Sequence, residues 1–423
     1  MHVTCEILTS VVDATYNPFE PGFAEDPYDQ YSRVREAGRT QRSLFDNLLI
    51  HRYDDCFALL RRAGTSVDDS NANITMRRRL PAELAEGREQ RGRRAILNLD
   101  PPDHTRIRRL VSKAFTMRRV EQLRPRVREL VDGFLDDVAR RGAGGEPVDL
   151  MTHFAFPLPF QVITELLGMP DGDRDQLREW SHTLTRVLEP VLDDESIREV
   201  IAATDNINAH VQDAIGWKRR NPGDDLLSAM IAAEEDGDSL SMGELVDQVV
   251  LLYLAGHETT VNLIGNGTLA LLRHRDQMEL LAADPTLDAG ATDELLRYDT
   301  PVHLSRRIVM ADMEIAGEDV KKGDLVITLL AAANRDPAHW GPTAGQLDLR
   351  REGAGAHLAF GSGIHHCLGA ALARLEGSEA LGALVRRFPD MELATDAPDW
   401  NGRIILRGLD TLEIVPNCVP KAA

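Results

Sequence analysis

The stretch Phe360-Gly-Ser-Gly-Ile-His-His-Cys-Leu-Gly369 places one cysteine, Cys367, among three closely spaced glycines. Glycines let the backbone turn tightly and approach a flat ligand. A helical pattern follows from about Leu368 to Arg387, so Cys367 stands just before a helix N-terminus, where N–H groups and the helix dipole favour a thiolate. Such a thiolate suits the axial position of haem iron. The alternative for Cys367 taken alone is an inert, buried cysteine.

A second distinctive segment is a long apolar stretch that begins at the capping box Ser241-Met-Gly-Glu244. It continues to about His274, which predicts a helix of about 33 residues and about 50 Å that crosses the body of the protein. Its middle, Ala255-Gly-His-Glu-Thr259, interrupts the apolar run with polar side chains. Because apolar residues flank this patch on all faces, a solvated helix turn is disfavoured and a buried polar site is predicted.

Together these segments resemble the cytochrome P450 family, in its bacterial, ferredoxin-dependent class. The haem-loop pattern of that family, F-G-x-G-x-H-x-C-x-G, is met at every fixed position. The resemblance extends from about residue 25 onwards and includes Glu294-x-x-Arg297 and Ala333-Asn-Arg-Asp-Pro337. It implies a mainly α fold with small β-sheets, shaped as a triangular prism around a long central distal helix. Length alone suggests about three domains, but the resemblance implies one domain over 1–423, with 1–24 as an N-terminal extension.

The resemblance implies that haem b is held by Cys367 and that Thr259 and Glu258 relay protons during the activation of O2. It assigns Glu294 and Arg297 to a buried structural ion pair, whose third partner is expected to be Arg350 or a neighbour in 348–351. Arg306 leaves a one-residue ambiguity next to Arg307. The other implied haem contacts are four propionate partners, two small distal-helix residues and three loop residues: His104, Arg108, Arg307 and His365; Ala255 and Gly256; Phe360, Gly361 and Gly369.

Substrate contacts are also implied by the resemblance. Mostly aliphatic walls indicate an apolar small molecule such as a terpenoid, steroid, fatty acyl chain or macrolide, typical of secondary metabolism. A histidine among them could orient a polar group. Regions 64–96 and 170–220 match the family least, as expected for substrate-recognition segments. The implied lining residues are Leu97, Asn98, Leu251, Leu254, Val302, His303, Leu304, Ile405 and Leu406.

The net charge and its distribution along the sequence indicate which kinds of partner the protein can bind. The formal net charge of −20 argues against a general nucleic-acid binder, which needs a basic surface. Residues 104–129 nevertheless carry nine Arg or Lys and two Glu. The resemblance places this helix at the docking face, so Arg109 and Lys113 are expected to receive an acidic ferredoxin. No flavin or nicotinamide domain fits in the remaining chain, so electrons from NAD(P)H are expected through a separate ferredoxin reductase.

The remaining features indicate a reduced, soluble, cytoplasmic protein, expected to be a monomer. The four cysteines are far apart, which disfavours disulfides and a zinc site. No signal peptide or membrane anchor is predicted.

The predicted reaction is insertion of one oxygen atom from O2, most simply a hydroxylation. A peroxide-driven peroxygenase and a non-catalytic haem-thiolate sensor are alternatives. The acid–alcohol pair disfavours the first, and the relay together with the docking patch disfavours the second.

Overall fold

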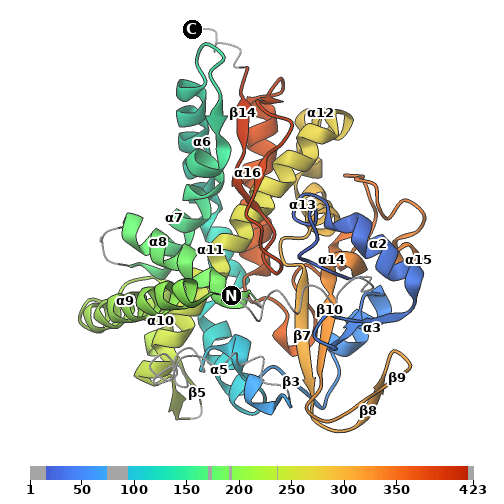
Figure 1. The fold of residues 1–423 in the computed structure, drawn as a ribbon. Helices are drawn as coiled ribbons and strands as arrows, with labels where there is room; N and C mark the ends of the chain where they lie inside the picture. The colour runs from blue at the N-terminus through green and yellow to red at the C-terminus, as the bar shows by residue number, and fades with distance from the viewer. Residues whose placement is uncertain (1–15, 74–93, 170–173, 190–192, 236, 418–423) are drawn as a thin grey trace.

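The computed structural model describes residues 16–73, 94–169, 174–189, 193–235 and 237–417, and Figure 1 shows a helix-rich body beside a smaller region that holds the main sheet. The helices are α2 (Pro27–Ala37), α3 (Tyr53–Leu60), α5 (Asp103–Ala114), α6 (Met117–Arg141), α7 (Pro157–Leu167), α8 (Arg174–Thr185), α9 (Asp194–Arg220), α10 (Leu226–Ala232), α11 (Met242–Arg273), α12 (Arg275–Ala283), α13 (Asp288–Tyr298), α14 (Leu330–Ala333), α15 (Pro337–Trp340) and α16 (Ala370–Arg387). Short 3₁₀ or π segments include η2 (Ile96–Asn98), η3 (Met151–Ala155), η4 (Arg186–Leu188) and η7 (Gly363–His365).

The strands are short and form several small sheets, as predicted. The largest sheet has the order β1-β2-β10-β7-β3, in which β10 pairs parallel with β2 and antiparallel with β7. The strands are β1 (Thr40–Arg42), β2 (Leu48–Ile50), β3 (Thr65–Ser66), β4 (Val148–Asp149), β5 (Glu234–Glu235), β6 (Asp238–Ser239), β7 (Leu304–Val309), β8 (Met313–Ile315), β9 (Glu318–Val320), β10 (Leu325–Leu329), β11 (Glu392–Leu393), β12 (Asp399–Trp400), β13 (Leu409–Thr411) and β14 (Glu413–Val415).

The central helix α11 confirms the prediction from the capping box. Its 32 residues begin after Ser241, whose side chain accepts from Glu244 N, while the Glu244 carboxylate accepts from Ser241 N. Every residue from Thr260 to Leu272 is buried, so the helix passes through the core. In Figure 1, α11 lies among the other helices of the body, and α6 and α16 lie side by side.

The N-terminal segment packs against the sheet region from Tyr16 onwards. Tyr16 and Phe23 are buried and contact the ring of Tyr31 on α2. Part of the predicted N-terminal extension therefore belongs to the core, because aromatic burial fixes it there. The rest, residues 1–15, lies outside the described residues.

Two boundaries differ from the sequence prediction, in which helical periodicity runs from 103 to about 140 and terminal strands span 403–415. The periodic stretch 103–140 is two helices, because the chain leaves the helix at Phe115 and Thr116 caps the next one by accepting from Arg119 N. The terminal strands begin at Leu409 rather than at Arg403, since residues 403–408 form an irregular segment. Among the described residues, no helix is long and apolar enough to cross a membrane.

Candidate active site

The cysteine loop is shaped by its glycines. Cys367 N donates to Phe360 O at 2.9 Å, which closes the loop onto itself. Gly361 and Gly363 have φ values of 65° and 72°, a left-handed conformation that favours glycine. At Gly363 the requirement is also steric, because a Cβ would lie 2.5 Å from the Leu60 carbonyl oxygen. The glycines therefore allow the left-handed turns that present Cys367.

Cys367 lies just before α16, and the residue is accessible to solvent although protein packs densely around its sulfur. The surrounding protein raises the pKa of the thiol by desolvation, while backbone N–H groups of Gly369 and Ala370 and the guanidinium groups of Arg108 and Arg374 lower it. Burial outweighs these groups, so the pKa is raised overall. The helix terminus thus acts in the predicted direction, but a bound metal cation is needed to make the thiolate the stable form.

Cationic and imidazole side chains gather near this loop. The Arg108 guanidinium donates to His366 O at 2.6 Å, which ties α5 to the cysteine loop. The rings of His104 and His365 lie 4.3 Å apart. Burial, reinforced by neighbouring cations, lowers the pKa of His365 to about 3 and also lowers that of His104. Both histidines are therefore neutral near pH 7 and can donate hydrogen bonds without carrying charge.

Arg307, rather than Arg306, is the buried arginine of β7. Burial lowers the pKa of Arg307 to about 10, and its guanidinium binds Ser305 Oγ and Arg306 O. Arg306 is exposed and forms a salt bridge with Asp69 at 2.8 Å. Strand alternation thus turns Arg307 inward and Arg306 outward.

The polar turn of α11 divides between two environments. Ala255 is exposed and Thr259 half-buried, whereas Glu258 is buried. Thr259 Oγ1 donates to Ala255 O at 2.8 Å, one turn earlier. A Cβ added to Gly256 would lie 3.4 Å from Ile163 Cδ1, so Gly256 packs against α7. Ala255 and Thr259 therefore form the open face of this turn.

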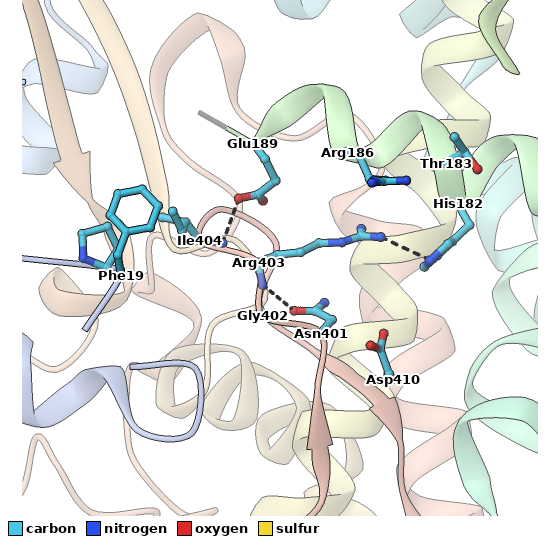
Figure 2. A pocket seen from close by; sticks show the side chains of 11 residues that line it. Phe19, His182, Thr183, Arg186, Glu189, Asn401, Gly402, Arg403, Ile404 and Asp410 are labelled. Atoms are coloured by element: carbon cyan, nitrogen blue, oxygen red, sulfur yellow. Dashed lines mark hydrogen bonds between the residues drawn. The ribbon is translucent and has the colours of Figure 1, made fainter. Parts of the chain in front are cut away.

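Glu258 is held by two residues from distant parts of the chain. Its carboxylate lies 3.3 Å from His182 Nδ1 on α8 and 3.2 Å from Arg403 Nη1. Burial raises the pKa of Glu258, but His182, His257 and Arg403 lower it more, so the net shift is downward. Glu258 is therefore a carboxylate at neutral pH. Figure 2 shows Arg403 reaching toward His182 across the pocket that both line.

The pair Glu294–Arg297 is fully buried, as predicted, and is part of a larger network. The guanidinium of Arg297 binds both carboxylate oxygens of Glu294 at 2.6 and 2.8 Å. Three backbone carbonyls, those of residues 334, 344 and 346, accept from it as well. The third partner is Arg351, whose Nε lies 3.1 Å from Glu294 Oε1. Arg350, the first candidate, is exposed.

Several predicted substrate residues do lie on partly open surfaces. Leu97 and Asn98 on η2 are exposed, and Leu251, Leu254, Val302 and Ile405 are half-buried. The loop of Leu97 is fixed to α11 by Gln248, which accepts from Ile96 N at 3.0 Å and donates to Arg94 O at 2.6 Å.

The prediction is wrong for His303. Its side chain is fully buried and its Nδ1 lies 2.8 Å from the hydroxyl of Tyr31, so it belongs to the N-terminal aromatic cluster and lines no open space. Leu304 packs against the same cluster, and Leu406 is only 2% exposed. The clustering of tyrosines in the N-terminal segment is the sequence signal for such packing.

Comparison with known proteins decides the family. The profile of the family described as Cytochrome P450 matches residues 70–285 and 278–401. Cytochrome P450 107B1 of Saccharopolyspora erythraea is 43% identical over 94% of this chain and 97% of its own length. The chain belongs to the cytochrome P450 family. The vitamin D(3) 25-hydroxylase of Pseudonocardia autotrophica is 39% identical to this chain. The match covers 96% of this chain and 98% of the hydroxylase. The solved structure of the polyketide synthase P450 PksS of Bacillus subtilis has a TM-score of 0.84 at 36% identity and covers 94% of this P450 and 99% of PksS.

A P450 monooxygenase uses haem b, O2 and electrons derived from NAD(P)H through redox partners. The residues of this P450 fit haem. Both ring nitrogens of His104 are buried without a hydrogen-bond partner in the described part of the chain. Within the same ranges, the guanidinium groups of Arg108 and Arg307 bond to backbone carbonyls and a hydroxyl rather than to a carboxylate. Two haem propionates would supply acceptors for all three.

Sequence reasoning missed His182, Arg403 and the pocket that they line. His182 falls in the region that matches the family least, and Arg403 lies in the irregular segment before β13. Their contact with Glu258 joins residues 76 and 145 positions apart. No local pattern indicates such a contact.

Proposed function

We propose that this P450 inserts one oxygen atom from O2 into an apolar small molecule, and that Cys367 would hold the haem iron. The supporting observation is that Cys367 is accessible at the end of its loop, with two backbone N–H groups and two guanidinium groups that favour its anion. His104, Arg108, Arg307 and His365 would hold the propionates. Phe360, Gly361 and Gly369 would form the loop that faces the macrocycle.

Haem, when bound, supplies the activation of O2 and its transfer to carbon. The protein must supply protons and exclude stray water. Thr259 would hold a proton at Oγ1 on the open face of α11, next to the small residue Ala255. Glu258 would pass protons toward that face, since it is a carboxylate at neutral pH and can take up a proton transiently. The expected consequence is that loss of Thr259 diverts electrons to peroxide.

The substrate class that we propose is a bulky apolar secondary metabolite of the terpenoid, steroid or macrolide type. Its supports are the aliphatic residues Leu97, Leu251, Leu254, Val302 and Ile405, and the relatives named for vitamin D(3) and for polyketide synthesis. The test is a ligand screen by the haem Soret band with vitamin D(3), testosterone and a macrolactone. Displacement of water from the iron by at least one of them is expected. Response only to small polar ligands would contradict the proposal.

The electron donor that we propose is an acidic ferredoxin that docks on α5, served by an NAD(P)H-dependent reductase. The supporting patch is smaller than the sequence suggests, because at least five basic residues of 104–129 bind carboxylates of the described part of the chain: Arg106, Arg119, Arg124, Arg126 and Arg128. Arg109 and Lys113 are exposed on α5, the helix that Arg108 ties to the cysteine loop. Electrostatic steering by such a patch weakens with salt.

Charge reversal tests this docking. The double variant Arg109→Glu, Lys113→Glu should reduce the rate of reduction by a plant-type ferredoxin about tenfold or more at low salt. Arg33→Glu, on the exposed face of α2, is the matched control and should leave the rate unchanged. An equal rate in wild type and double variant would refute the docking site.

A further inference from the structure

The carboxylate of Glu258 is shielded from water, yet it has one partner that reaches solvent. The side chain of Glu258 is 5% exposed, that of Arg403 10% and that of His182 43%. His182 lines an open pocket of about 400 Å³ whose other charged residues are Arg186, Glu189, Arg403 and Asp410. The imidazole therefore spans the distance between the pocket and the buried carboxylate.

The hydrogen bonds fix the tautomer of His182. Arg403 Nη2 lies 3.2 Å from His182 Nε2, and a guanidinium can only donate. Nε2 must therefore be the bare acceptor nitrogen. The proton of the neutral ring is then on Nδ1, which points at Glu258 Oε2 at 3.3 Å.

Only one of the two partners can exchange a proton. A guanidinium stays protonated at any pH at which the protein is folded, whereas imidazole takes up and releases protons near neutrality. Arg403 is further fixed by Thr185 Oγ1, which accepts from its Nη1. Arg403 thus orients the relay and His182 is the group able to load it.

We propose that His182 is the residue through which protons pass from the solvent-filled pocket to Glu258. When the hydrogen bond from Arg403 Nη2 to Nε2 breaks, Nε2 takes a proton from pocket water. Nδ1 then gives its own proton to Glu258 Oε2. The ring is neutral again, with its proton on Nε2. A turn of the ring brings Nδ1 to pocket water, which protonates Nδ1 and accepts the proton of Nε2, and the reverse turn restores the starting arrangement. The inference rests on the proposed role of Glu258 in the relay.

The charges around His182 suit this task. On α11, the Glu258 carboxylate stabilises the transient imidazolium, whereas His257 carries charge only when protonated. On the C-terminal segment, Asp410 stabilises the imidazolium and Arg403 destabilises it. Arg186 is held by Glu199 of α9 at 2.5 Å. Glu189 accepts from the backbone N–H groups of residues 404–406, which keeps the segment of Arg403 beside α8.

The test compares His182→Gln with Glu258→Gln, with Thr183→Ala as a control from the same pocket. Glutamine keeps a donor and an acceptor but cannot carry a proton. The haem-loaded proteins are driven by a plant-type ferredoxin and its reductase, and O2 uptake is recorded against pH in H2O and D2O. His182→Gln should slow uptake about tenfold at pH 8, less than the hundredfold or more typical of a directly acting acid–base group. It should also raise the solvent isotope effect, while Thr183→Ala behaves as wild type.

The outcomes separate the two proposals. If Glu258→Gln slows uptake and His182→Gln keeps the wild-type pH profile and isotope effect, His182 is not the donor although Glu258 is in the relay. If neither variant differs from wild type, the role of Glu258 fails and the inference fails with it. A second readout needs no turnover: ¹⁵N NMR of histidine-labelled protein should show His182 with a protonated Nδ1 and a bare Nε2. The opposite tautomer would overturn the proposal.

Discussion

Replacement of Arg297 by Met tests the buried network that supports the segment before the cysteine loop. The substitution roughly keeps the side-chain volume but removes every donor of the guanidinium. Glu294 keeps Arg351 and the N–H of Asp348 as partners, so its charge is only partly compensated. Gln346 O keeps Arg351 as a donor, whereas the carbonyls of Asn334 and Ala344 lose the guanidinium N–H.

The expected loss can be estimated from these contacts. Removing one partner of a buried ion pair costs about 3–5 kcal/mol, and each buried carbonyl left without a donor costs about 1–3 kcal/mol. Because coupled contacts do not add fully, the expected loss is about 5 kcal/mol. That is a large part of the about 5–15 kcal/mol by which proteins are stable.

The assay is urea unfolding of the haem-loaded protein, followed by far-UV circular dichroism and by the Soret band. Lys321→Met is the control, because Lys321 and Asp312 form an ion pair with 67% and 64% exposed side chains. A fully exposed ion pair contributes little to stability, so this variant should unfold nearly like wild type. A loss below about 1 kcal/mol for Arg297→Met would refute the reasoning.

Three further predictions follow from the site. Thr259→Ala should retain haem but release most of the consumed O2 as peroxide, measured as the ratio of peroxide to NAD(P)H oxidised; unchanged coupling would remove Thr259 from the relay. Gly363→Ala should destabilise the haem-loaded protein by about 2–4 kcal/mol in urea unfolding, because strained backbone and a clash with Leu60 O add; wild-type stability would show that the loop adapts. The lowered pKa of Glu258 means that its ionised form stabilises the fold above its ordinary value of 4.5 and that this stabilisation is lost as pH falls through the lower folded pKa. Glu258→Gln should therefore lose stability at pH 7 and approach wild type as the pH falls through the lowered pKa of Glu258, whereas a pH-independent difference would contradict the assignment.

The amino-acid sequence predicts those parts of the fold that depend on residues close together in the chain. The capping box at Ser241 and the apolar run behind it set the central helix, and the glycines around Cys367 set the loop. Both signals are local, so they can be read directly. The break between α5 and α6 is not predicted, because hydrophobic periodicity continues across Phe115 and Thr116.

Residues whose role depends on distant contacts were harder to predict. The choice between Arg306 and Arg307 depends on which face of β7 is buried, and the choice between Arg350 and Arg351 depends on the path of a loop. His303 was misassigned because its partner, Tyr31, lies 272 residues away. His182 and Arg403 were missed for the same reason, since only the folded chain brings α8, α11 and the C-terminal segment together.

The central claim is that Cys367 binds haem iron as a thiolate, and the spectrum of the reduced protein with carbon monoxide tests it most directly. Wild type should give the red-shifted Soret band that is typical of a thiolate ligand. Cys367→Ser should lose that band while far-UV circular dichroism keeps its helical signal. A carbon monoxide complex of wild type without the thiolate band, or one that keeps the band in Cys367→Ser, would contradict the account.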